Sequence, residues 1–125
     1  LLLPLDPDES ARGIRQRLFE ATGVGIGVII SDSHGRPFRL GNVNVAIGVA
    51  GMPALIDLRG QPDLFRRTLR ISIQGYADMV AAAAGLLTGE GAEGLPVVLV
   101  RGLSYPEIDG RASQINRPAE LDLYR

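Results

Sequence analysis

The sequence predicts an α+β fold in which a mixed sheet of about four strands packs against an alanine-rich helix. Residues 7–21 carry apolar side chains at helical spacing. Residues 74–87 are rich in alanine, the strongest helix former. Several short segments rich in Val, Ile and Leu lie between and after these helices, and their pattern is typical of strands. The pattern leaves the strand order open.

Length and composition limit the classes of protein. The 125 residues suit one domain, and a hydrophobic fraction of 46% is enough to form a core. A formal net charge of −1 argues against a protein that coats nucleic acid. The chain has no cysteine, which excludes disulfides, thiolate nucleophiles and zinc ribbons and is compatible with a cytoplasmic location.

The chain contains no apolar run approaching about 20 residues, so we expect no membrane span. The opening Leu1-Leu2-Leu3 is too short for the core of a signal peptide. Because no Met precedes Leu1, we expect the chain to be cut from, or processed out of, something longer.

Residues 7–21 are predicted to form the first helix. Asp6 is a preferred N-cap residue, Pro7 suits the first helical position, and two acids follow in the first turn. Gly23 is a plausible end of the helix, because glycine readily takes the left-handed conformation that closes one.

Residues 24–31 and 43–50 are predicted strands, each with one bulky and one small face. In the first, Gly25 and Gly27 alternate with branched residues. Glycine weakens a strand unless something must approach closely. We therefore expect the alanine-rich helix over 74–87 to lie on these glycine faces.

Three further segments are less regular. Residues 54–58 indicate a short strand ended by Arg59-Gly60, and residues 95–102 read as a buried strand with Pro96 near its start. The ending, residues 117–125, could begin a helix or act as a linker.

The first candidate site is the segment 31–39, directly after the first strand. Asp32 with an adjacent hydroxyl is a common way to present hard oxygen ligands to a divalent metal. Arg36 and Arg39 could face phosphate oxygens, which a guanidinium binds in pairs. The competing interpretation is a turn in which Asp32 binds backbone groups and both arginines are solvated.

The second candidate site is the glycine-rich segment 89–94 around Glu90, where a ligand or metal could approach closely. A flexible connection with solvated acids is the competing interpretation, since no Walker-type glycine motif is present. Other side chains are weaker candidates, with a surface role or a simple ion pair as the alternative: His34, the pair Asp57 and Arg59, and the cluster Arg66, Arg67 and Arg70.

Taken together, these segments resemble the coenzyme F-420:L-glutamate ligase family. Residues 31–39 resemble its S-D-[ST]-x-G-R-P-[FW]-R segment, and residues 41–51 its G-x-V-x-x-A-I-G-x-A-G strand. Residues 57–65 are similar to D-x-R-G-x-x-D-L-F, and residues 77–98 to A-D…A-A-A…G-E-x-x-E-x-x-P-V-V. Arg117-Pro118-Ala119-Glu120 resembles a terminal Arg-Pro-x-Glu. The resemblance covers essentially residues 1–125 and implies the C-terminal half of a gamma-glutamyl ligase domain.

The resemblance implies an enzyme that adds L-glutamate to the deazaflavin coenzyme F-420-0 through γ-glutamyl amide bonds while GTP is split. Mg²⁺ or Mn²⁺ would bridge the nucleotide phosphates. Asp32, Ser33 and Glu90 are implied as metal ligands, which requires their two loops to meet in space. Arg36 and Arg39 are expected to contact anions, whereas the resemblance identifies no residue as catalytic.

The resemblance also implies a homodimer with intertwined subunits, and an N-terminal half that carries a further acidic ligand and much of the GTP pocket. That half would come from the rest of a longer chain or from a separate partner. Arg66 departs from the family pattern, which often has Gly after Asp-Leu-Phe. A non-catalytic fragment used for dimerisation is the first alternative function, and a ligase acting on another acid and amine is the second.

Overall fold

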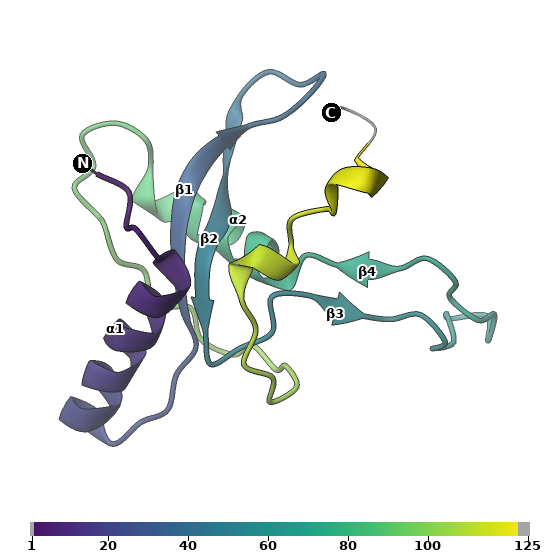
Figure 1. Cartoon of the computed structure of the whole chain (residues 1–125), viewed down its shortest axis with the longest axis horizontal. Coiled ribbons are helices and arrows are strands. Elements are labelled where there is room, and N and C mark those ends of the chain that lie inside the picture. Colours follow the sequence, from purple (N-terminus) through teal and green to yellow (C-terminus); the bar gives the residue numbers. More distant parts are fainter. Residues whose placement is uncertain (1, 123–125) are drawn as a thin grey trace.

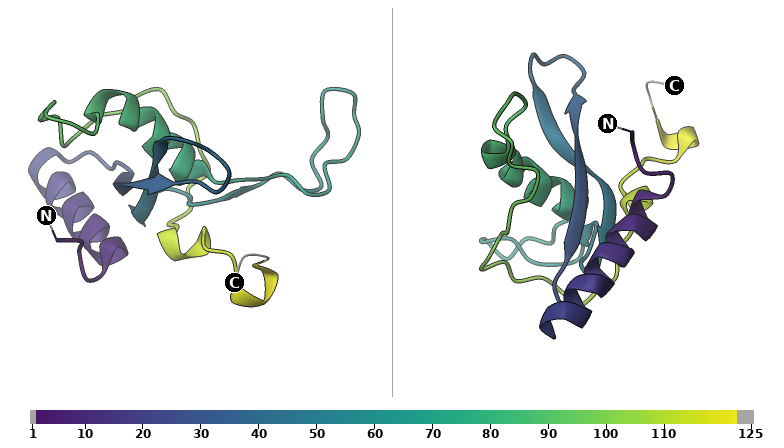
Figure 2. Two further views of the ribbon diagram at one scale, coloured as in Figure 1. Left: turned by 90° about the horizontal axis from the view of Figure 1, so that it is seen from above. Right: turned by 90° about the vertical axis from the view of Figure 1, so that its left-hand side faces the viewer.

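The computed structural model describes residues 2–122 and contains one long antiparallel hairpin between two helices. The hairpin joins β1 (Val28–Gly35) to β2 (Asn42–Ala50). Helix α1 (Pro7–Thr22) lies on one side of it and helix α2 (Tyr76–Thr88) on the other (Figures 1 and 2). Two short 3-10 helices, η1 (Ala112–Gln114) and η2 (Ala119–Leu121), follow near the C-terminus.

Helix α1 confirms the prediction for residues 7–21 to within one residue at its end. The Asp6 side chain accepts a hydrogen bond from the backbone N–H of Glu9 at 2.8 Å, and Pro7 occupies the first turn. Gly23 takes a left-handed φ of 69° and donates its N–H to the Phe19 carbonyl. Local capping chemistry therefore sets both ends of this helix.

The first strand is displaced from its predicted position. It begins at Val28 rather than Val24 and continues to Gly35, so most of the expected turn over 31–39 is strand. A register shift between Ile30 and Ser31 leaves Ile47 without a direct partner. An extra residue of this kind reverses the alternation of side chains along the bulged strand. The prediction that the branched residues of β2 share one face along its whole length is therefore wrong.

The prediction that α2 covers the glycine faces is also wrong. A Cβ atom at Gly27 would lie 2.9 Å from the Met52 sulfur, and one at Gly48 would fall on the carbonyl of Pro7 in α1. Helix α2 instead contacts the sheet elsewhere. Its Gly85 lies so close to Asn44 of β2 that a Cβ there would be 3.0 Å from the amide carbon.

The predicted mixed sheet of about four strands is two separate two-stranded antiparallel sheets. The second joins β3 (Ile56–Asp57) to β4 (Ile73–Gln74), at the base of an arm that projects from the body (Figure 2). Residues 95–102 form no strand, because no backbone in the described part of the chain pairs with them. Within residues 2–122, no helix is long and apolar enough to cross a membrane. The segment 117–125, expected to begin a helix or act as a linker, contains the short helix η2. Its residues 123–125 lie outside the described residues.

The core is small and is built mostly from short side chains. Its buried members are Ala46, Val49, Met52, Ala77 and Ala112. Tyr76 and Tyr105 pack beside it with ring centroids 5.8 Å apart.

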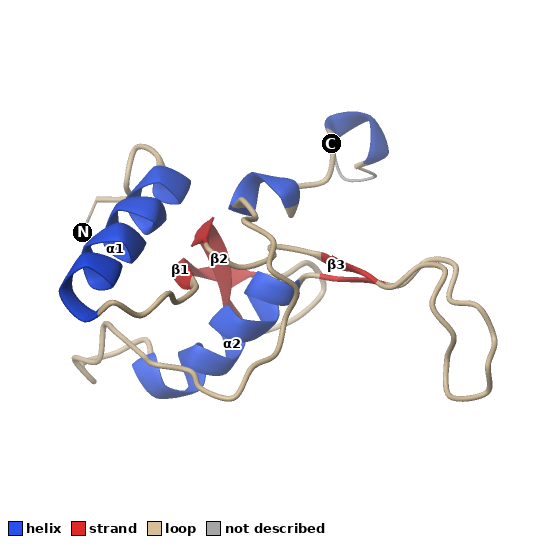
Figure 3. Ribbon diagram, turned by 90° about the horizontal axis from the view of Figure 1, so that it is seen from below, coloured by secondary structure: helices blue, strands red, loops and turns tan. Residues whose placement is uncertain are grey.

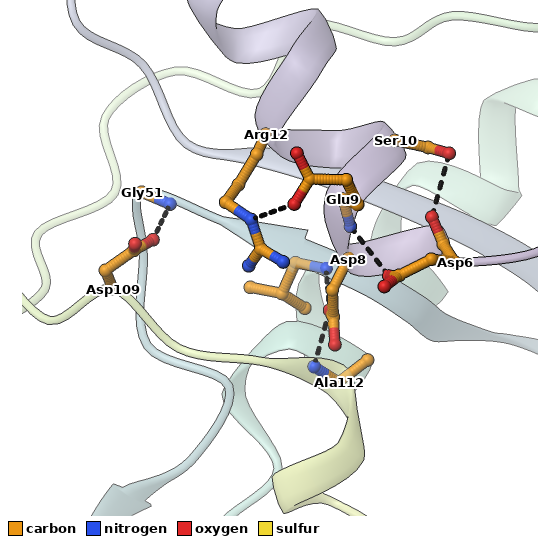
Figure 4. Close-up of polar contacts among 9 residues, drawn as sticks. Asp6, Asp8, Glu9, Ser10, Arg12, Gly51, Asp109 and Ala112 are labelled. Atoms are coloured by element: carbon orange, nitrogen blue, oxygen red, sulfur yellow. Dashed lines mark hydrogen bonds and ion pairs between the residues drawn. The ribbon is translucent and has the colours of Figure 1, made fainter.

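Polar bonds to the backbone complete the packing around this core. Oδ1 of Asp8, in the first turn of α1, accepts the N–H of Val49 at 2.8 Å and the N–H of Ala112 at 2.9 Å (Figure 4). Asp109 accepts the N–H of Gly51 at 2.7 Å. The half-buried Asp8 carboxylate therefore joins α1 to both β2 and η1.

Replacing Asp8 with alanine is expected to lower the free energy of unfolding by about 2–4 kcal/mol, because two backbone donors lose a charged acceptor together. Asp8→Asn keeps an acceptor oxygen and should lose less than half as much. Urea unfolding followed by circular dichroism measures both, with the exposed Glu107→Ala as control. A loss below about 0.5 kcal/mol for Asp8→Ala would contradict this role.

Gly48→Ala is expected to destabilise the chain by about 1–3 kcal/mol, because the added methyl group meets the backbone of Pro7. Gly25→Ala is the matched control, since its Cβ position has no atom within 4 Å. It should be neutral or slightly stabilising. Thermal unfolding measures the melting temperatures of the two variants. Equal melting temperatures would contradict the close packing of α1 against β2 at Gly48.

Candidate functional site

The distal half of β1 carries the first group of predicted site residues. Asp32 and Ser33 lie within the strand rather than in a turn after it, and both are exposed. Asp32 Oδ1 accepts a hydrogen bond from the backbone N–H of Ser33 at 2.9 Å. One oxygen of this exposed carboxylate is therefore bound to the backbone of its own strand.

The second predicted loop reaches the same hairpin. Helix α2 ends at Thr88, and Gly89 follows with a positive φ of 65°. Glu90 Oε2 then accepts a hydrogen bond from Asn42 Nδ2 at 3.2 Å, and Thr88 Oγ1 lies 3.4 Å from Asn44 Nδ2. Two asparagine side chains of β2 thus hold the end of α2 and the exposed Glu90 beside the hairpin.

The strand register decides which side chains share a face. Ser33 is opposite Asn44 and Asp32 is opposite Val45. Directly opposed residues of an antiparallel pair point to the same face, and neighbours along a strand point to opposite faces. Ser33 therefore shares the face of Asn44 and Glu90, whereas Asp32 lies on the other face. For Asp32 and Glu90 to bind one ion, the Asp32 carboxylate must reach around the edge of β1.

The two arginines of the hairpin turn behave differently. Arg36 Nη2 lies 3.4 Å from the Leu40 carbonyl oxygen and 3.5 Å from that of Gly41, so the guanidinium folds back over the turn. Its buried Nε has no hydrogen-bond partner in the described structure. Arg39 is exposed within the same turn. Both bonds of Arg36 are long, and long hydrogen bonds are weak.

The oxygen donors have the right chemistry for a hard divalent cation but form an incomplete set. Carboxylate and hydroxyl oxygens suit Mg²⁺ and Mn²⁺. Within residues 2–122, no three His, Cys, Asp or Glu side chains gather where they could hold a metal ion. Ser33 and Glu90 are therefore two oxygen donors of a suitable kind, outside any cluster of three acidic or histidine side chains in residues 2–122.

The weaker candidates lie at three different places in the structure. Asp57 and Arg59 form an ion pair with Nη2 to Oδ2 at 2.6 Å, beside the base of the β3–β4 arm. His34 is exposed on β1, two residues from Asp32 and on the same face. The exposed arginines of the arm, Arg66, Arg67 and Arg70, lie in the projecting segment and not beside Glu90.

Sequence reasoning missed the asparagines that place the second loop. Asn42 and Asn44 occupy unspecified positions of the motif over 41–51, and an amide on a strand carries no signal of its partner. Their spacing of two residues, which puts both on one face, is the only clue available.

Comparison with known proteins identifies relatives of this chain. The family described as F420-0:Gamma-glutamyl ligase matches residues 1–102. A coenzyme F420:L-glutamate ligase of Methanocaldococcus jannaschii is 48% identical over 99% of this chain and 50% of the relative. Those of Methanopyrus kandleri and Archaeoglobus fulgidus are 48% and 47% identical, over 100% of this chain and 51% and 50% of the relatives.

The chain therefore belongs to the F420-0:gamma-glutamyl ligase family. It spans about half the length of the curated relatives it matches. Those relatives are named as ligases of coenzyme F420 and L-glutamate, which indicates the class of enzyme from which a function for this chain can be argued.

The pKa of Asp57 is lowered from 3.8 to about 2, mainly because its carboxylate accepts hydrogen bonds from the Arg59 side chain and backbone. A lowered folded-state pKa gives a stabilising contribution that is present above about pH 4 and lost as the pH falls toward 2. Arg59→Ala should raise the pKa of Asp57 toward its ordinary value. A carboxyl-detected NMR titration measures this, and Arg70→Ala should leave it unchanged.

Proposed function

We propose that this chain supplies part of the active site of a ligase that joins L-glutamate to the deazaflavin coenzyme F-420-0 through γ-glutamyl amide bonds. GTP would be the cosubstrate, and Mg²⁺ or Mn²⁺ the cation. The observation that carries the proposal is the Asn42–Glu90 hydrogen bond, which seats the second acidic loop beside the strand of Asp32 and Ser33. Membership of the family supports the choice of reaction.

In this proposal, Asp32, Ser33 and Glu90 hold the cation with oxygen ligands, and a further acid comes from the remaining half of the protein. The cation, when bound, screens the negative charge of the nucleotide phosphates. Asn42 fixes Glu90 before any ligand arrives, so less ordering is needed at binding.

Arg36 and Arg39 would contact anionic groups of the nucleotide or coenzyme. The Arg36 guanidinium would leave the carbonyls of Leu40 and Gly41, and these contacts of 3.4 and 3.5 Å cost little to exchange. A phosphate would also satisfy its unpartnered Nε, since a planar guanidinium presents several donors to one anion.

The complete enzyme in this proposal is a homodimer, with the remaining half of each subunit in the same chain or in a separate one. The main alternative is a non-catalytic fragment used for dimerisation, which the incomplete donor set within residues 2–122 favours. A second alternative keeps the fold and changes the acid and amine that are joined.

The test uses the complete protein, or this chain reconstituted with the remaining half of a relative. GTP with Mn²⁺ at about a hundredfold above their dissociation constants should raise the melting temperature by about 5–10 °C. Asp32→Ala and Glu90→Gln should remove most of this shift, whereas Glu107→Gln should keep it. Mass spectrometry after incubation with glutamate should then show a lengthened coenzyme tail.

Each alternative function predicts a different outcome of these measurements. A melting temperature indifferent to GTP plus Mn²⁺, with a stable oligomer in size-exclusion chromatography, supports the non-catalytic fragment. A shift with GTP but no glutamate added to the deazaflavin supports another pair of substrates.

A further inference from the structure

Residues 95–100 have the form of a strand without a neighbour. Gly94 and Gly102 bound the segment with positive φ angles of 67° and 82°. Between them the exposed fractions of Leu95, Val97 and Leu99 are 53%, 84% and 64%.

Val98 is half-buried and Val100 is 38% exposed, so exposure alternates over residues 97–100 as it does along a strand, whereas Pro96 is exposed like its neighbours. No backbone N–H of this segment donates to any backbone carbonyl in the described part of the chain. Backbone donors and acceptors of an apolar segment need partners, and a β-ladder is the usual source.

Helix α2 is uncovered on the same side. It is apolar around its whole circumference, with Asp78 as its one charged residue. Its Ala77 and Ala81 are buried, but Met79, Leu86 and Leu87 are 56%, 87% and 61% exposed. A helix that is hydrophobic all round is normally buried on every side. Figure 3 shows the segment after α2 running along the side of the helix that faces away from β1 and β2.

The accessible surface measures how much covering is missing. The chain exposes 9767 Å², whereas a compact protein of 13.3 kDa exposes about 6,400 Å². The excess of about 3,300 Å² is several times the 800 Å² that each partner buries in a standard interface. The projecting β3–β4 arm contributes to this excess, and the exposed apolar residues of α2 and of 95–100 contribute the rest that a covering element would bury.

We propose that residues 95–100 form a strand of a second sheet, completed by the polypeptide that makes up the remaining half of the relatives' length. That sheet covers the outer face of α2, so the helix lies between two β layers. The relatives carry this polypeptide in a chain twice as long as this one, which makes it the occupant rather than a second copy of this chain. The inference does not depend on the reaction.

Hydrogen exchange measured by mass spectrometry tests the proposal on this chain alone and co-expressed with the remaining half of the Methanocaldococcus jannaschii relative. In the complex, the amides of residues 97–100 should exchange at least about a hundredfold more slowly, as paired strands do. Leu99→Asp should weaken the complex by at least about tenfold, because a charge would be buried. Leu40→Asp, at the exposed hairpin turn, should change the affinity by less than about twofold.

Three results would overturn the proposal. The first is a complex in which residues 97–100 exchange as fast as in the isolated chain. The second is protection of these amides in a homo-oligomer of this chain, which would make a second copy the occupant. The third is the absence of any complex although the chain is folded by circular dichroism.

Discussion

The structure depends on two carboxylates that close the free edge of β2. Among residues 2–122, β2 pairs with β1 alone, so the N–H groups on its other edge need different acceptors. Asp8 of α1 accepts from Val49, and Asp78 of α2 accepts from Ala46 at 2.9 Å. Both acids lie in the first turn of a helix, where the helix dipole also favours negative charge. Each helix is thereby fixed by its N-terminus to the same short stretch of strand.

This anchoring explains where the second acidic loop falls. From Asp78 to its last residue, Thr88, α2 advances about 15 Å along the helix axis. From Ala46 back to Asn42, the strand covers about 13 Å. A helix anchored at Ala46 and running back along β2 at a modest tilt therefore brings its end close to Asn42, where the Glu90 hydrogen bond forms. The position of Glu90 therefore depends on contacts at both ends of α2: the Asp78 hydrogen bond at its start and the Asn42 and Asn44 contacts at its end.

The parts of the fold that the sequence predicted are those under local control. Asp6, Pro7 and Gly23 define α1 by chemistry within a few residues. Other features depend on residues far apart in the sequence, and the spacing of apolar residues does not predict them. The bulge opposite Ile30 joins residues about 20 positions apart, and the contact between Gly48 and Pro7 joins residues about 40 positions apart. In the candidate site, the sequence indicated the two segments that hold the candidate residues, whereas the Asn42–Glu90 contact and the assignment of Asp32 and Ser33 to opposite faces were not predictable. That assignment depends on register, and register is set by pairing across the hairpin.

The two incomplete features of the molecule have a common origin. Within residues 2–122, the segment 95–100 has no backbone hydrogen-bond partners, and Ser33 and Glu90, the ligands of our proposal, belong to no cluster of three acids. The unpaired segment and the candidate ligands lie on the same side of the hairpin as α2. Ser33, Asn44 and Glu90 share that face, and the segment 95–100 runs along the outer side of α2. A covering sheet on α2 would therefore also bring new side chains toward the end of the helix that holds Glu90. In our two proposals, completion of the fold and completion of the ligand set are therefore one structural event.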